Sequence, residues 1–293
     1  MRRPFLSATL LALAAAMACL TAGAAAAKPP VWIIRDKDST IVLFGSVHVL
    51  PAGLDWAPPA LTDALAKADD LWFEIPITPE TQQQASVLAQ ALGPFPANDS
   101  LSNHLTPAQG QKLRRVAAEL SLSTLALERM RPWLAEVTVS VAMDARMGAR
   151  ASDGVEEKIE ALAPATARRR AFETAPQQIG FLAGAPMETQ VASLDETLTE
   201  IEDRPETYEK VVQDWQDGDV AALKTDALDP LLTAAPVLYQ RLIVERNSRW
   251  TRIIQRRLKG HGVTVIVVGA GHLIGPDGVP AMLRARGVAV EGP

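Results

Sequence analysis

Two short motifs with the same pattern lie near opposite ends of the chain, and each could bring a histidine into an active site. The segment IVLFGSVH ends at His48 and the segment VIVVGAGH ends at His272, so that four apolar residues precede Gly-x-x-His in both. In an α/β sheet the loops at the carboxyl ends of the strands line the binding crevice, and glycine permits a sharp turn or a close approach to a ligand. We therefore expect both histidines to follow buried strands and to meet in space.

A third candidate is Glu74, which lies in the apolar segment LWFEIP. Burying an unpaired carboxylate is costly, so this residue needs a cation, an arginine or a metal as its partner. Two histidines and a carboxylate form a common divalent-metal site with open positions for water and substrate. The alternative is that Glu74 faces solvent from an edge strand.

The helical segment YQRLIVERNSRWTRIIQRRL carries a polar residue on its apolar side. Ile243, Asn247, Trp250 and Ile254 follow helical spacing, which places Asn247 on the apolar stripe and Arg246 beside it. An inward amide and an adjacent guanidinium suit the binding of an oxyanion, or the holding of a carboxylate such as Glu74. The alternative is an asparagine that packs helices together and an arginine at the surface.

The remaining histidines are expected to be structural. His104 in SNHLTP and His261 in LKGHGV both lie in polar turns. His261 also follows the end of a predicted helix, where the helix dipole favours a cation.

Residues 1–27 are typical of a secretory signal peptide: Arg2 and Arg3 precede an apolar core, and three alanines precede Lys28. An uncleaved anchor is the alternative, although the apolar core is short for a membrane span. Cleavage would remove Cys19, the single cysteine, and leave residues 28–293 as a domain without disulfides. We expect a periplasmic or secreted protein with no further membrane segment.

The charge of the chain argues against nucleic acid as a partner. The formal net charge is −5, and the basic run Arg168-Arg169-Arg170 is short and isolated. A peptide or another small substrate is the expected partner, and the sequence leaves the oligomeric state open.

The pattern of the elements predicts an α/β fold with a central mixed sheet and a large helical middle region. VWIIRD and STIVLFGS form a predicted hairpin, DLWFEIP a third strand, and GVTVIVVGAGH and GVAVEG the last strands. Residues 78–258 are helical almost throughout in this interpretation, with proline near the first turn of several helices. The sheet would be built from two similar strand-loop units, each carrying a Gly-x-x-His motif.

These residues resemble those of the TraB/GumN-type proteins, which include the Tiki-type metalloproteases. The resemblance rests on GSVH and GAGH, on Glu74 in LWFEIP, on ERN at residues 245–247 and on DGVEEKI at residues 153–159. Glu156 stands where many relatives have an aspartate, which keeps the charge. The segment FETAPQQ makes Glu173 a lesser candidate for the site.

The resemblance implies a fold related to erythromycin-esterase-like and ChaN-like proteins, and a hydrolase that uses manganese or cobalt rather than zinc. We expect a metal-dependent periplasmic peptidase in which His48, His272 and Glu74 hold or flank the metal. Arg246 would stabilise the oxyanion and Asn247 would position it. Two alternatives remain: a metal-independent, esterase-like hydrolase with a histidine as general base, and a non-catalytic binding protein for haem, metal or glycan.

Overall fold

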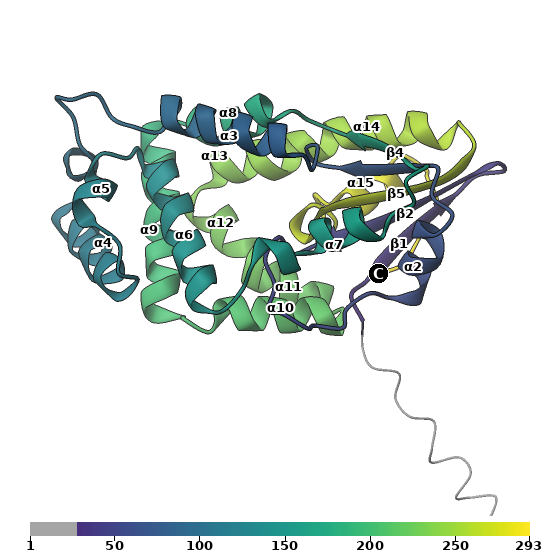
Figure 1. Ribbon diagram of the computed structural model, residues 1–293, viewed down its shortest axis with the longest axis horizontal. Coiled ribbons are helices and arrows are strands. Elements are labelled where there is room, and N and C mark those ends of the chain that lie inside the picture. The colour runs from purple at the N-terminus through teal and green to yellow at the C-terminus, as the bar shows by residue number, and fades with distance from the viewer. Residues whose placement is uncertain (1–27) are drawn as a thin grey trace, which may run out of the picture.

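The computed structural model describes residues 28–293, so the predicted signal peptide lies outside the described residues. A six-stranded mixed sheet occupies one end of the molecule and a helical region the other (Figure 1). The strand order is β4-β3-β5-β2-β1-β6. The strands are β1 (Val31–Arg35), β2 (Ser39–Ser46), β3 (Asp70–Phe73), β4 (Arg168–Ala171), β5 (Gly262–Gly269) and β6 (Val290–Glu291). The expected α/β fold with a mixed sheet is confirmed.

The two central strands are the most apolar because neighbouring strands surround them. β2 and β5 pair in parallel, and β3 pairs in parallel with both β5 and β4. Strands buried in this way form continuous apolar runs rather than alternating patterns, which explains IVLF and VIVV. The predicted hairpin is confirmed, since β1 pairs antiparallel with β2 and β6 adds to the outer edge of β1.

Most of the chain between β3 and β5 is helical. The α-helices are α2 (Pro59–Leu65), α3 (Pro79–Leu92), α4 (Pro107–Glu119), α5 (Thr124–Glu128), α6 (Pro132–Arg146), α7 (Val155–Leu162), α8 (Ala175–Ala183), α9 (Met187–Asp203), α10 (Thr207–Asp217), α11 (Val220–Ala227), α12 (Asp229–Ala234), α13 (Pro236–Tyr239), α14 (Glu245–Leu258) and α15 (Val279–Arg284). Short 3-10 helices span Leu101–His104, Ala151–Asp153 and Ala270–His272. Among residues 28–293 no helix combines the length and the apolar character needed to cross a membrane.

Two structural features were not anticipated from the sequence. The middle region contains β4, an edge strand formed by Arg168–Ala171, where only helices and a basic run were expected. A π-helix (Gln240–Val244) lies between α13 and α14 and ends directly before the segment that carries Arg246. Single π turns of this kind are often found at functional sites.

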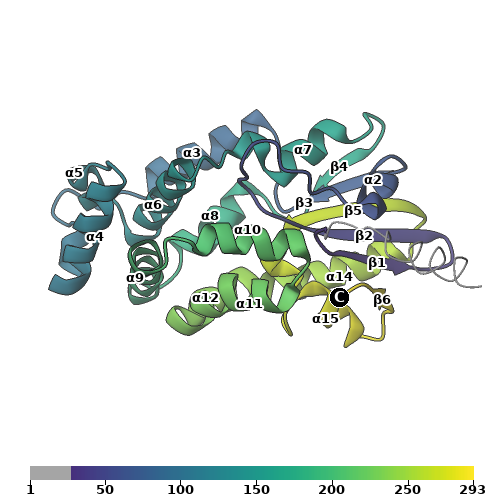
Figure 2. The same cartoon turned by 90° about the horizontal axis from the view of Figure 1, so that it is seen from below.

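The hydrophobic core has two main parts. The larger one surrounds the sheet and includes Phe44, Trp215 and Trp250. The other lies among α4, α5, α6 and α9, at the far end of the molecule from the sheet (Figure 2). α3 packs beside α8 and extends from the helical region toward the sheet (Figures 1 and 2).

Candidate functional site

The carboxyl ends of three parallel strands meet at one edge of the sheet and bring the candidate side chains together. Ser46 at the end of β2 is in register with Gly269 at the end of β5. His48 and His272 follow these two strands closely, and Glu74 directly follows β3. The sequence interpretation placed Glu74 within its strand, whereas β3 ends at Phe73.

The backbone of Gly269 is the point on which three side chains converge. Its N–H donates to Glu74 Oε1 at 2.7 Å. A β-carbon at this position would lie 3.2 Å from Glu74 Oε1, 3.6 Å from His48 Nε2 and 3.7 Å from His272 Cδ2. Glycine therefore leaves open the small space that the two histidines and the carboxylate share.

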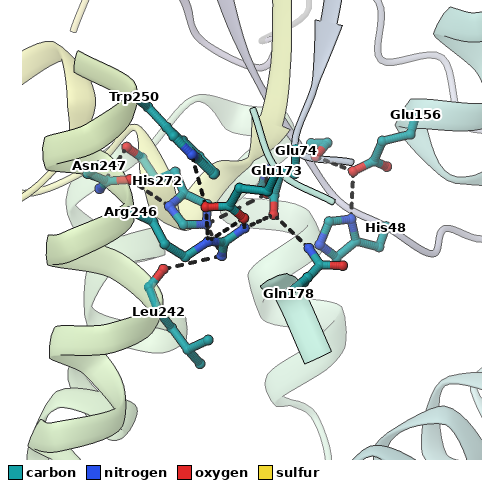
Figure 3. A network of polar contacts seen from close by, with 12 residues as sticks. His48, Glu74, Glu156, Glu173, Gln178, Leu242, Arg246, Asn247, Trp250 and His272 are labelled. Atoms are coloured by element: carbon teal, nitrogen blue, oxygen red, sulfur yellow. Dashed lines mark hydrogen bonds and ion pairs between the residues drawn. The ribbon is translucent and has the colours of Figure 1, made fainter. Parts of the chain in front are cut away.

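Arg246 binds two buried carboxylates at once (Figure 3). Its Nη2 donates to Glu74 Oε2 at 2.5 Å and lies 2.9 Å from Glu173 Oε2. Its Nε donates to Glu173 Oε1 and Oε2 at 3.1 and 3.0 Å. The indole N–H of Trp250 also donates to Glu173, at 3.1 Å. Glu173 thus neutralises the guanidinium and lets it hold Glu74 in one orientation.

Glu74 is ionised in this network. Burial alone would raise its pKa, but His272, Arg246 and His48 outweigh that effect and lower the pKa to about 2. The side-chain amide of Gln178 adds a further donor, 3.2 Å from Glu74 Oε2. Both carboxylate oxygens are therefore fixed by protein donors.

The tautomer of His272 follows from its neighbours. Arg246 Nη1 lies 3.0 Å from His272 Nε2, and since a guanidinium can only donate, Nε2 is the acceptor. The proton therefore sits on Nδ1 and is donated to Asn247 Oδ1 at 2.7 Å. Asn247 is held in turn by the carbonyl of Asp277, to which Nδ2 donates at 2.7 Å. Burial lowers the pKa of His272 to about 3, so this ring is neutral at pH 7.

His48 is held from the opposite side. Its Nδ1 lies 2.6 Å from Glu156 Oε1, and the hydroxyl of Ser46 donates to the same oxygen at 2.6 Å. The Glu156 carboxylate raises the pKa of His48 above its usual range. Since 68% of the His48 side chain faces solvent, the ring can exchange protons with water.

A cavity of about 270 Å³ opens beside these groups. His48, Glu74 and Glu156 form its polar part, with Gln178 and Glu157. The rest of its wall is apolar and consists of Phe73, Ile75, Ile77 and Ala151. Apolar walls around a few convergent polar groups are typical of a small-molecule or peptide-side-chain site.

The donor atoms suit a divalent cation, although among residues 28–293 no group of three or more His, Cys, Asp or Glu side chains is arranged to hold one. Both histidines have Nδ1 fixed by an outer partner. Metal-binding histidines are usually oriented in this way. His48 directs Nε2 toward the space beside Gly269, whereas His272 presents Cδ2 to that space and its Nε2 accepts from Arg246. Glu74 Oε1 and His272 Nε2 lie 3.6 Å apart, close to the roughly 3.4 Å between two tetrahedral ligands of one zinc-sized ion. The residues therefore fit a metal in chemistry, and their arrangement would do so once His272 Nε2 exchanged its hydrogen bond from Arg246 for the ion.

The sequence interpretation assigned some roles differently from the observed contacts. It expected Asn247 to position Arg246, but Asn247 hydrogen-bonds to His272. Its oxyanion role for Arg246 needs a free guanidinium, but the guanidinium is occupied by two carboxylates, by His272 and by the Leu242 carbonyl. Its other interpretation, an arginine that holds Glu74, agrees with the contact between Arg246 and Glu74.

Two candidates of uncertain role have clear positions. Glu156 contacts His48, and Glu173 contacts Arg246. Ser46, Gln178 and Gly269 were not predicted as site residues from the sequence. Ser46 and Gly269 lie within the two Gly-x-x-His motifs, and Gln178 is the last residue of FETAPQQ.

The other two histidines lie elsewhere. His104 stacks on Phe95 in the helical region and lies 2.9 Å from Asp99. His261 is exposed in the turn before β5.

Comparison with known proteins places these features in a family. The model of the TraB/PrgY/gumN family matches residues 30–292. "Uncharacterized protein YbaP" of Escherichia coli (strain K12) is 25% identical over 245 residues, which cover 83% of this chain and 87% of that protein. An "Uncharacterized protein" of Treponema pallidum (strain Nichols) is 22% identical over 268 residues, covering 87% of this chain and 80% of the relative. No solved structure matches. Because the family model matches the chain from β1 to β6, the protein belongs to the TraB/PrgY/gumN family.

Proposed function

We propose that this protein is a metal-dependent hydrolase of peptide bonds that acts in the periplasm. The observation that carries the proposal is the convergence of His48 Nε2, Glu74 Oε1 and the His272 ring on Gly269. Each of these groups is oriented by a separate outer partner. Such a preorganised set of two imidazoles and a carboxylate suits a divalent cation, and the resemblance to Tiki-type metalloproteases favours manganese or cobalt.

Each residue of the site would have a separate role. His48, His272 and Glu74 would hold the metal, which when bound lowers the pKa of a water molecule and polarises a carbonyl group. Arg246 and Glu173 would keep Glu74 ionised and in place. Asn247 would keep the proton of His272 on Nδ1, so that Nε2 could bind the metal in exchange for its hydrogen bond from Arg246.

The cavity beside the site favours peptides over large polar substrates. Its apolar wall can take an aliphatic or aromatic side chain next to the bond to be cleaved. His48 lies at the solvent side of this cavity, where it can reach a bound substrate without moving the sheet.

A second candidate mechanism is supported by the contact between His48 and Glu156. A carboxylate 2.6 Å from Nδ1 would orient the ring toward water, and above the raised pKa of His48 the neutral ring would act as a general base without a metal. Here Glu156, rather than Glu74, would be the orienting carboxylate. Sensitivity to chelators separates this mechanism from the first.

The test combines metal analysis with turnover. Purified protein is stripped with chelator, reloaded separately with manganese, cobalt or zinc, and assayed on a library of peptides and esters. We expect metal-dependent peptide cleavage that His48→Ala and His272→Ala abolish, while the exposed His261→Ala retains it. Turnover in the stripped protein would favour the general-base mechanism, and metal or haem binding without any turnover would favour a binding protein.

The periplasmic location is part of the proposal. Mass spectrometry of protein recovered from the cell envelope should show a chain that begins near Lys28. An intact Met1 would contradict export with cleavage. A relationship to erythromycin-esterase-like and ChaN-like folds is also proposed, and comparison with an experimental structure would test it.

A further inference from the structure

A second, larger cavity of about 490 Å³ lies where β3 and β4 begin and α14 ends. Asp70 is the first residue of β3, whereas Glu74 follows the end of that strand. Four residues of extended chain place the two carboxylates about 13 Å apart. The cavity is therefore separate from the candidate hydrolase site.

This cavity is lined by an excess of positive charge, and we call it the basic pocket. Its charged and aromatic residues are Asp70, Trp72, Arg168, Arg170, Arg256, Arg257 and His261. Even with Asp69, which lies near Arg168 outside the lining, four guanidinium groups face two carboxylates. The run Arg168-Arg169-Arg170 contributes two of them, because alternate residues of β4 face the same side.

Asp70 arranges three of these arginines. Its buried carboxylate accepts from Arg168 Nε and Nη2 at 2.9 and 2.8 Å and from Arg170 Nε at 2.8 Å. Arg257 Nη2 approaches it to 3.1 Å. One carboxylate therefore fixes several guanidinium groups around a single cavity without neutralising them.

Several donors of the basic pocket remain unused within residues 28–293. Arg170 donates only through Nε, so its two terminal nitrogens have no protein acceptor there. Arg256 makes neither a hydrogen bond nor an ion pair with any described residue. The Nε1–H of Trp72 is buried and has no acceptor in the described part of the chain. The guanidinium of Arg170 lies 5.9 Å from the centre of the Trp72 ring.

We propose that the basic pocket binds a small ligand that carries phosphate groups. Planar guanidinium groups with free terminal nitrogens match the oxygens of phosphate in paired hydrogen bonds. The volume exceeds that of one phosphate and leaves room for a second, or for an organic group against Trp72. Because the whole chain carries a net charge of −5, the positive charge is local, which favours a small anion over a nucleic-acid polymer.

Isothermal titration of the full mature chain with pyrophosphate and with orthophosphate tests this proposal. We expect saturable binding, tighter for pyrophosphate, that weakens as salt is added. Arg170→Gln and Arg256→Gln should each lower the affinity for pyrophosphate about tenfold or more, which corresponds to about 1.4 kcal/mol. Arg170 is 46% exposed, so its replacement leaves the core intact.

Arg252→Gln is the matched control, since this exposed arginine lies on α14, outside the lining of the basic pocket, and its side chain donates to Ser248. It should bind pyrophosphate like the wild type. Failure of the wild type to bind either anion at millimolar concentration would overturn the proposal. Equal affinity in Arg170→Gln, Arg256→Gln and wild-type protein would overturn it as well.

The phosphate could belong to a soluble molecule or to a lipid headgroup. Cosedimentation with vesicles of phosphatidylglycerol, compared with phosphatidylcholine alone, separates the two sources. Binding to anionic vesicles that pyrophosphate competes away and Arg256→Gln abolishes would identify a headgroup. Pyrophosphate binding without vesicle binding would identify a soluble ligand, and vesicle binding unaffected by either change would contradict the proposal.

Discussion

Replacing Arg246 should destabilise the protein far more than replacing Glu74, because two buried carboxylates share this single guanidinium. Arg246→Gln leaves Glu74 without its guanidinium partner and leaves Glu173 with only the partly exposed Arg249, 3.5 Å away. Removing one partner of a buried ion pair costs about 3–5 kcal/mol, and we expect the upper part of that range.

Glu74→Gln leaves Arg246 bound to Glu173 through Nε and Nη2. The new amide oxygen can still accept from the N–H of Gly269. The loss is then mainly the difference between a charge-assisted and a neutral hydrogen bond, about 1 kcal/mol. The double variant should recover about 1–3 kcal/mol relative to the sum of the single changes, because position 74 is then uncharged and only Glu173 has lost its buried cation, with Arg249 still 3.5 Å away.

Urea denaturation at pH 7 in the presence of chelator measures these free energies without any contribution from metal binding. Arg252→Gln, an exposed arginine on the same helix, controls for the loss of an arginine from α14. Equal losses for Arg246→Gln and Glu74→Gln would refute the asymmetric sharing of charge. Strict additivity in the double variant would refute the direct pairing.

Three further outcomes are expected. Burial raises the pKa of Glu136 to about 7, although two hydroxyl hydrogen bonds oppose the shift, so its contribution to stability is full below about pH 4.5 and is lost as the pH rises through 7. In urea titrations the free energy of unfolding of Glu136→Gln should therefore rise by up to about 3 kcal/mol relative to that of the wild type between pH 5 and pH 8. A difference between the two proteins that stays constant with pH would contradict the raised pKa. Glu156→Gln should weaken metal binding about 10- to 100-fold by releasing His48, as measured by competition with a chromogenic chelator, and unchanged affinity would remove Glu156 from the support of His48. Gly269→Ala places a methyl group 3.2 Å from Glu74 Oε1, so turnover should fall while the melting temperature changes by only a few degrees; wild-type turnover would show that the space beside this glycine is not used.

The strands that enclose the site could be predicted because burial between parallel neighbours leaves a clear sequence pattern. The runs before Gly45 and Gly269 are almost purely apolar, and both became central strands. Helix starts were also marked by local chemistry: the Thr106 side chain and Gln109 form a reciprocal cap at α4, and proline opens that helix.

The edge strand β4 could not be predicted from its own residues. Arg-Arg-Arg-Ala has no apolar face and little β propensity. Its position depends on backbone pairing with β3 and on Asp70, which lies far away in the sequence. Information of this kind resides in tertiary contacts rather than in the segment.

The positions of the site residues could be anticipated better than their partners. The stripe through Ile243, Asn247 and Trp250 predicted a buried asparagine, and Asn247 is fully buried. The same pattern did not predict that Asn247 would hydrogen-bond to His272 or that Arg246 would bind the carboxylates of Glu74 and Glu173. That division depends on how α14 lies against the sheet, which helical spacing alone does not define.

The position of β5 has a consequence for how the protein folds and for whether it can be assembled from two fragments. β5 fills the gap between β3 and β2, although it follows both in the chain by the whole helical region. Until residues 262–269 pair with both strands, β2 and β3 have no common neighbour in the sheet, and Glu74 after β3 is not held close to His48 after β2. Such late, long-range pairing makes the closing of the sheet a slow folding step. A fragment that ends with α14 should therefore lack the assembled site, and adding the carboxyl-terminal segment in trans should complete it.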